Sequence, residues 1–118
     1  MSLIQQLKKG SMPLLILSIL QEEPMYGYQI MQELKDRSQG FFIVTAASLY
    51  PALHKLESDH LVISHWEDGD GNRRRKYYTI TERGEAKLGD HVSEWQMFVQ
   101  NLFAFIPPSL REPEGGLA

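Results

Sequence analysis

A β-hairpin with a basic tip is the feature that most constrains the fold of this chain. Two strand-prone runs, 61–66 and 77–80, flank a turn at 68–72 that consists of Asp, Gly and Asn. That composition is typical of tight hairpin turns. Four basic residues follow the turn directly: Arg73, Arg74, Arg75 and Lys76. The sequence therefore predicts a hairpin with an apolar stem and a cationic end that can lie against a polyanion.

Side chains alternate along a strand, and this sets which basic groups act together. Arg73 and Arg75 should point one way, and Arg74 and Lys76 the other. About three of these four side chains are expected to reach DNA phosphates at once. A hairpin tip that is merely solvated is the alternative interpretation of such a charge run. Trp66, at the base of the hairpin, is expected to join the core.

The segment before residue 23 is expected to be helical, as one helix or as two. Ser11 can act as an N-cap and Pro13 is tolerated in a first turn, which favours a main helix over residues 11–22. A preceding helical arm, with a kink near Gly10, is predicted by three apolar residues at helical spacing: Leu3, Ile4 and Leu7.

A second helix is expected after Pro24, over residues 25–38, with Gly40 closing it. Gly27 lies on the apolar stripe of this helix and is expected to let the first helix approach closely. The apolar run at 41–44 predicts a short strand at the edge of the sheet.

A third helix is predicted from a cap at Thr45 or Ser48 to about Asp59. Its apolar face is formed by Leu49, Leu53 and Leu56. No acidic residue occurs between 45 and 56, so the opposite face carries nothing that repels phosphate. Hydroxyl groups can donate to phosphates, and His or Lys can reach guanine N7 or O6. Five residues are therefore candidate DNA contacts: Ser48, Tyr50, Pro51, His54 and Lys55.

The last helix is predicted from a cap at Thr81 to residue 107. Apolar residues recur along it at alternating spacings of four and three, which is a heptad seam. The seam residues are Leu88, Val92, Trp95, Val99, Leu102 and Ile106. A domain of this size cannot bury the whole seam, so we predict that two copies of the chain pair through it and through the apolar residues of the N-terminal arm.

Aromatic residues near the middle of the seam suggest a second role. Trp95, Phe98 and Val99 are predicted to lie close to the axis of the dimer. They either pack simply between the two copies or line a slot that accepts a flat apolar or aromatic effector.

The charge of the chain is uneven. The formal net charge is −3, yet residues 1–80 carry nine basic and nine acidic residues, whereas residues 81–118 carry three and six. DNA binding requires a local basic surface rather than a basic total. The acidic total therefore does not exclude a DNA-binding protein.

Composition argues against several other classes of function. The chain has no Cys, which rules out disulfides and thiolate metal sites and fits a reducing compartment. Among the four histidines only His60 and His65 have ligand-like spacing, so neither a metal nor another cofactor is expected. No phosphate-binding loop or Ser/His/acid set supports an enzyme. Without a signal-peptide pattern or a long apolar run, a cytoplasmic protein with no membrane partner is expected.

Four motifs resemble the PadR family of bacterial transcriptional regulators in their order and spacing. They lie at residues 26–30, 48–57, 73–78 and 81–84, and the resemblance covers about residues 10–106. The single helix after the hairpin is similar to the short subfamily. The resemblance implies a winged-helix homodimer that binds operator DNA, mostly as a repressor, and that an effector releases in several members. It also implies that the third helix enters the major groove while the hairpin approaches the minor groove or the backbone.

The predicted fold class is α+β, mainly helical: a winged helix-turn-helix with a C-terminal dimerisation helix. The DNA-binding domain is expected at residues 1–80, the dimerisation helix at 81–107 and a disordered tail at 108–118. The predicted function is homodimeric, sequence-specific regulation of transcription. The predicted partners are double-stranded operator DNA, a second copy of the chain and a small apolar or aromatic effector. A protein-interaction adaptor that has this fold but does not touch DNA is the alternative.

Overall fold

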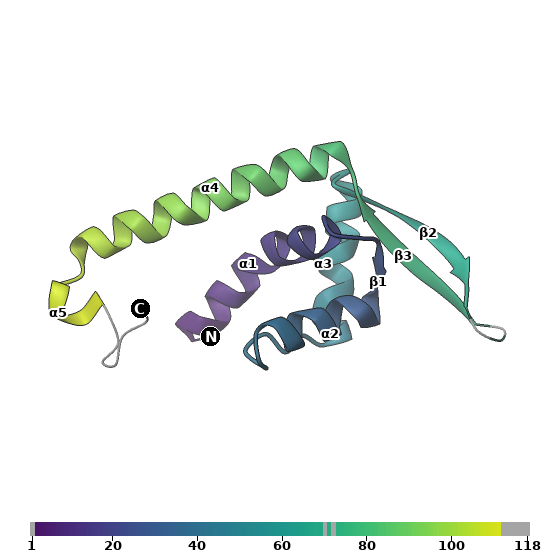
Figure 1. The fold of residues 1–118 in the computed structure, drawn as a ribbon, viewed down its shortest axis with the longest axis horizontal. Helices are drawn as coiled ribbons and strands as arrows, with labels where there is room; N and C mark the ends of the chain where they lie inside the picture. Colours follow the sequence, from purple (N-terminus) through teal and green to yellow (C-terminus); the bar gives the residue numbers. More distant parts are fainter. Residues whose placement is uncertain (1, 70, 72, 112–118) are drawn as a thin grey trace. The chain divides into compact units, whose positions relative to one another are not determined.

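The computed structural model describes residues 2–69, 71 and 73–111 of the 118-residue chain. Contacts divide the chain into two units, residues 1–88 and residues 89–118, which are described separately below. The elements, in chain order (Figure 1), are α1 (Leu3–Leu20), β1 (Met25–Tyr26), α2 (Gly27–Arg37), α3 (Ala46–Ser58), β2 (Val62–Asp68), β3 (Arg74–Ile80), α4 (Glu82–Phe105) and α5 (Pro108–Arg111). The predicted mainly helical α+β fold is confirmed.

The N-terminal segment forms one helix, α1, which is one of the two options that the sequence left open. The predicted cap at Ser11 is wrong, because the Ser11 hydroxyl donates to the carbonyl of Lys8 at 2.9 Å inside the helix. The helix instead begins with a capping box at Ser2. The Ser2 hydroxyl accepts from the Gln5 amide, and the Gln5 side chain accepts from the Ser2 amide, both at 3.1 Å. Two satisfied donors at this end give the helix its start.

The edge of the sheet is formed by β1 rather than by residues 41–44. Met25 and Tyr26 pair antiparallel with Tyr78 and Tyr77 of β3, so the predicted start of the second helix at residue 25 is wrong. The predicted strand at 41–44 is wrong as well, because that segment has no strand pairing in the structure. Its apolar residues at 42 and 44 pack against the core instead.

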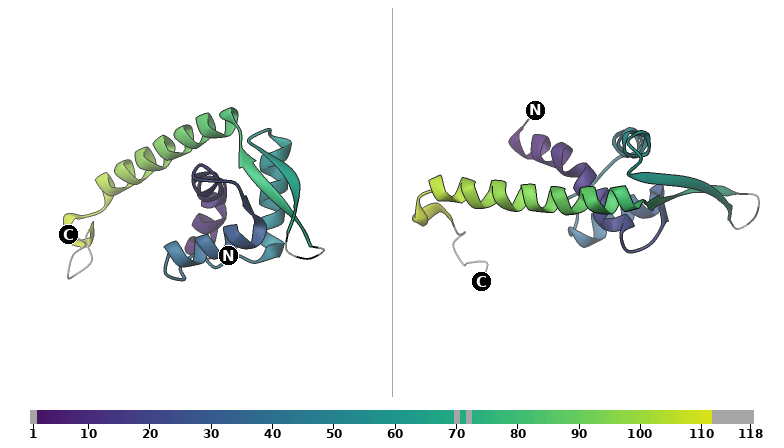
Figure 2. Two further views of the ribbon diagram at one scale, coloured as in Figure 1. Left: turned by 45° about the vertical axis from the view of Figure 1, so that its right-hand side comes forward. Right: turned by 90° about the horizontal axis from the view of Figure 1, so that it is seen from above.

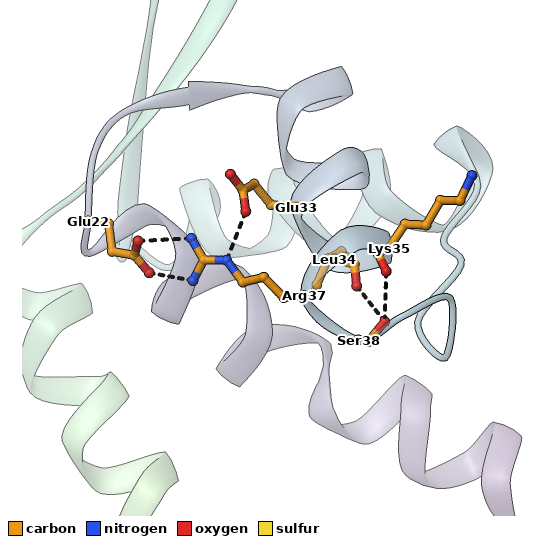
Figure 3. A network of polar contacts seen from close by, with 6 residues as sticks. All are labelled: Glu22, Glu33, Leu34, Lys35, Arg37 and Ser38. Carbon is orange, nitrogen blue, oxygen red and sulfur yellow. Dashed lines mark hydrogen bonds and ion pairs between the residues drawn. The ribbon is translucent and has the colours of Figure 1, made fainter.

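Arg37 ties the end of α1 to α2 (Figure 3). Its guanidinium makes two hydrogen bonds to the Glu22 carboxylate, and its Nε donates to Glu33 at 2.8 Å. The bonded guanidinium lowers the pKa of Glu22. Both carboxylates and the guanidinium are substantially exposed, so these ion pairs add little stability. Ser38 ends α2 by donating to the carbonyl of Leu34 at 2.6 Å.

Gly27 allows a close approach of α3, a neighbour that the sequence did not suggest. A Cβ at this position would lie 2.3 Å from the hydroxyl oxygen of Tyr50, far inside van der Waals contact. The first residue of α2 is therefore small because the aromatic ring of Tyr50 rests against it.

The sheet has the order β1-β3-β2, and its hairpin register pairs Val62 with Ile80 at the base and Asp68 with Arg74 near the tip. In Figures 1 and 2 the β2–β3 hairpin extends beyond the helices α1, α2 and α3. The inner face of the sheet closes the core together with these helices. The buried apolar residues of the core are Ile16, Leu17, Ile19, Leu20, Met25, Ile30, Leu34, Leu49, Leu53, Leu56, Leu61, Val62, Tyr78 and Leu88.

Helix α4 begins against the hairpin. The Thr81 hydroxyl accepts from the amide of Gly84 at 2.9 Å, which confirms Thr81 at the start of the helix. Gly84 and Leu88 are buried. Leu88, predicted to belong to the dimer seam, is therefore used in the core of its own chain, because the first turns of α4 pack on the base of the hairpin.

The predicted disordered tail is partly helical. Residues 108–111 form the short helix α5, and the Arg111 side chain donates to the carbonyl of Ile106 at 2.8 Å. The rest of the predicted tail, residues 112–118, lies outside the described residues, as do residues 70 and 72 of the predicted hairpin turn.

Two glycines of α4 should respond oppositely to replacement by Ala. A Cβ at Gly84 would lie 2.1 Å from the carbonyl oxygen of Leu61, a backbone atom that cannot move aside freely. We expect Gly84→Ala to destabilise the protein by about 1–3 kcal/mol in chemical denaturation. Gly89→Ala meets nothing within 4 Å and is the matched control. It should leave stability unchanged or raise it by up to about 1 kcal/mol, since Ala favours helix. Equal effects of the two changes would contradict the packing of α4 on the hairpin.

Candidate nucleic-acid interface

The predicted contact residues of α3 lie on its exposed side. Burial of Leu49, Leu53 and Leu56 confirms the predicted apolar face of the helix. A helix places side chains on opposite sides according to its period of 3.6 residues, so that burial turns the other face outward. All five predicted contact residues are exposed: Ser48, Tyr50, Pro51, His54 and Lys55.

The first turn of α3 presents hydroxyl groups. Thr45 is the N-cap and accepts from the amide of Ser48 at 3.2 Å, which makes it the right one of the two caps that the sequence left open. The Thr45 hydroxyl also donates to the Ser48 oxygen, at 3.2 Å. Ser48 therefore accepts within the chain, and its own proton is available for an outside acceptor such as a phosphate oxygen.

Lys55 is the one lysine of α3. Its ammonium lies 3.1 Å from the Asp59 carboxylate, one turn further along the helix. The Lys55 side chain is 76% exposed, so this surface pair is weak and does not hold the lysine back from another anion.

The β2–β3 hairpin, called the wing from here on, carries its basic groups over aromatic rings. The guanidinium of Arg74 lies 5.5 Å from the Trp66 ring centre, and that of Arg75 lies 4.6 Å from the Tyr26 ring centre. Lys76 shares the Trp66 ring with Arg74, at 6.0 Å. Arg74 and Lys76 thus lie on one side and Arg75 on the other, in agreement with the predicted alternation.

Trp66 is not a core residue, which corrects the expectation from the sequence. Its side chain is 55% exposed, because β2 continues past the helices at this point. The ring instead supports the cations above it through their attraction to its π face. The strand pairing is consistent with this role, because Trp66 lies directly opposite Lys76 in the sheet.

The four basic residues of the wing differ in their exposure to solvent and in their contacts. Arg73 and Arg74 are exposed, and the Arg74 guanidinium, besides its contact with Trp66, lies 3.6 Å from the Asp68 carboxylate. Arg75 and Lys76 are half-buried. The Lys76 ammonium also lies 3.9 Å from the Glu57 carboxylate at the end of α3.

Glu57 is a residue of this surface that the sequence interpretation missed. Glu57 accepts a hydrogen bond from the Ser64 hydroxyl of β2 in addition to its contact with Lys76. Burial, followed by the nearby carboxylate of Glu57 and by Tyr50, raises the pKa of Tyr78. Contacts between α3 and the two strands of the wing therefore meet at one side chain.

The second unit carries the predicted seam in exposed form. Val92, Phe98, Val99 and Leu102 are exposed, whereas Trp95 is half-buried and meets the Phe98 ring edge-on at 6.2 Å. Ile106 is half-buried as well. In the first unit the apolar residues of the predicted N-terminal arm are also exposed: Leu3, Ile4 and Leu7. Within a single chain, these apolar side chains are left without full burial.

No group of three or more His, Asp or Glu residues among the described residues is arranged to hold a metal ion. Within the same residues, no helix has both the length and the apolar character needed to cross a lipid bilayer.

Comparison with known proteins agrees with this geometry. The sequence profile of the transcriptional regulator PadR-like family matches residues 16–90. A transcriptional regulator of Mycobacterium tuberculosis is 33% identical over 85 residues, which cover 72% of this chain and 76% of that protein. An uncharacterized protein of Lysinibacillus sphaericus is 34% identical over 87 residues, or 74% of this chain and 80% of that one. The crystal structure of a PadR family transcriptional regulator from Eggerthella lenta matches with a TM-score of 0.80 and 31% identity, covering 89% of each chain.

The family match extends over more than half of the chain and includes α2, α3 and the wing. The predicted winged helix-turn-helix is confirmed by the solved structures that share it, and the members of the family are regulators of transcription rather than enzymes. This chain belongs to the PadR-like family of transcriptional regulators.

Proposed function

We propose that the protein is a homodimeric, sequence-specific repressor that binds operator DNA through α3 and the wing. The observation that carries the proposal is the exposed face of α3, which has no acidic residue between 45 and 56 and lies in the same unit as the basic wing. A helix that faces phosphates needs such a face. Operator binding implies the cytoplasm as the compartment in which the protein works.

We expect α3 and the wing to contribute to DNA binding in different ways. His54 and Lys55 are exposed on α3 and can reach base edges in a major groove, whereas Ser48 and Tyr50 can donate to phosphates. Pro51 has no amide proton to donate and offers an apolar surface to the groove. Arg73, Arg74 and Arg75 supply positive charge for the backbone, which adds affinity without sequence preference.

Dimerisation is proposed because the seam is exposed in a single chain. Val92, Val99 and Leu102 are all more than a third exposed, at 37%, 39% and 46%. Apolar residues repeated at heptad spacing are buried in proteins by a second helix. A second copy of the chain would also supply a second α3, as binding to a two-fold operator requires.

Release by an effector is the finer part of the proposal. Trp95 and Phe98 form an edge-on aromatic pair, and Val99 follows on the same helix. Between two copies, these residues would line an apolar slot in which a flat aromatic molecule can stack. A ligand bound there changes operator affinity only if it favours one spacing of the two recognition helices over another.

An adaptor that does not bind DNA is the competing function, and a gel shift with random duplex DNA separates the two. A regulator should bind weakly to any sequence and lose affinity steeply as salt rises. An adaptor should give no shift at low salt. No shift with random DNA or with genomic fragments would remove the proposal.

The wing is tested by its salt dependence. Replacing Arg73, Arg74 and Arg75 with Ala should weaken binding to all sequences about equally. It should also flatten the slope of log affinity against log salt by roughly one unit for each phosphate that the wing no longer neutralises. Filter binding across a salt series measures the slope. An unchanged slope would show that the wing does not touch the backbone.

The recognition helix is tested by its specificity. His54→Ala or Lys55→Ala should cost on the order of 1–3 kcal/mol on the operator and much less on unrelated DNA. Both side chains are exposed, so the melting temperature should stay within a few degrees of the native protein. A large fall in stability together with an intact specificity ratio would mean that this face of α3 does not read bases.

The seam is tested by the oligomeric state. Truncating Trp95 and Val99 to Ala should shift the protein toward monomer in sedimentation velocity and weaken operator binding with it, because paired recognition helices bind as a unit. The matched control is Glu94→Ala on the same helix, which should remain dimeric. A native protein that sediments as a monomer would remove both the dimer and the effector slot.

A further inference from the structure

Glu57 is the side chain in which α3 meets both strands of the wing. It belongs to the last turn of α3, and its side chain is 33% exposed. One carboxylate oxygen accepts the hydroxyl of Ser64 from β2, and the other lies 3.9 Å from the ammonium of Lys76 on β3. A single side chain therefore holds one partner on each strand of the hairpin.

Helix stability does not explain a carboxylate at this position. The C-terminal end of a helix carries partial negative charge, so an acidic residue in the last turn is unfavourable there. A carboxylate near a DNA-facing surface also repels phosphate. Both costs are offset if the negative charge is neutralised by Lys76 and hydrogen-bonded by Ser64.

The cation that neutralises Glu57 is one of the four basic residues of the wing. The Lys76 side chain is 38% exposed, compared with 63% for Arg74, and it lies further from the tip. Its ammonium also lies 5.7 Å from the ring centre of Tyr78, a buried residue of the core. These contacts direct Lys76 toward α3 and the core rather than toward solvent.

We propose that Glu57 is a positioning residue that fixes the recognition helix relative to the wing, with Ser64 and Lys76 as its two partners. Lys76 then acts through Glu57, not through a phosphate. The inference rests on the proposed function, because it concerns how two DNA-contacting elements keep their spacing. Phosphates lie at fixed intervals along any duplex, so a wing that moves relative to α3 can still contact phosphates. It would no longer hold α3 at a defined position on the operator, and specificity would fall.

Two variants separate positioning from direct contact. Lys76→Met removes the charge but keeps the length of the side chain, and it should leave the salt slope unchanged while lowering operator affinity about fivefold. Arg73→Ala is the matched control from the same wing, and it should flatten the salt slope by roughly one unit. Filter binding to the operator and to random duplex DNA gives the slope and the specificity ratio for each variant.

Glu57→Gln tests the ion pair with Lys76 separately from the hydrogen bond with Ser64. The amide oxygen still accepts from Ser64, but the ion pair is removed and the Lys76 ammonium is freed. Affinity for random DNA should hold or rise, with a salt slope steeper by up to about one unit, while the ratio of operator to random affinity falls about fivefold. The double variant Glu57→Gln/Lys76→Met should return to the native salt slope and lose no more specificity than either single variant.

The outcomes distinguish this proposal from the proposed function itself. A salt slope that falls by one unit in Lys76→Met, as in Arg73→Ala, would make Lys76 a phosphate contact and overturn the positioning role while DNA binding stands. A specificity ratio that is unchanged in Glu57→Gln would overturn it as well. If the native protein binds neither the operator nor random duplex DNA, the proposed function fails. Should Lys76→Met not fold, Ser64→Ala replaces it, with the same expected fall in specificity and an unchanged salt slope.

Discussion

Burial of one side of α3 is the constraint on which the rest of the structure depends. Leu49 and Leu53 are fully buried and Leu56 nearly so, each contributing about 1.5–3 kcal/mol from apolar burial. Because their positions repeat at helical spacing, the helix has only one rotation that buries all three. That rotation sets the exposed face, including His54, without any contact to DNA. The specificity that we propose for this face thus depends on the same packing that stabilises the fold.

Close contacts extend this constraint from α3 to its neighbours. The ring of Tyr50 rests on α2 at Gly27, where any side chain would collide with it. Glu57, at the other end of α3, contacts both strands of the wing. The exposed elements proposed to touch DNA are therefore each held by a specific contact as well as by the core. An acidic chain can bind a polyanion under these conditions, because the Glu57 carboxylate at the end of α3 is already engaged by Ser64 and Lys76.

The elements that local sequence patterns determine were predicted correctly. The strand and the side-chain contacts that depend on residues far along the chain were missed. Leucine spacing and the Gly/Asp/Asn turn were sufficient for α3 and the wing, because periodicity and turn chemistry are local. The strand at Met25 was missed, since its two residues form a strand only where β3 offers a free edge. The capping box at Ser2 overrode the expected start at Ser11. The contacts of Glu57 were invisible in the sequence, because their partners lie 7 and 19 positions further along the chain.

We propose that two copies of α3 read one operator from the same face of the duplex. Hydroxyl-radical footprinting on a genomic fragment recovered with the native protein tests it most directly. A two-fold dimer should give two protected blocks separated by about one helical turn, roughly 34–36 Å, with weaker protection where the wings flank them. A single protected block, or protection that shows no defined position on the fragment, would contradict paired recognition helices.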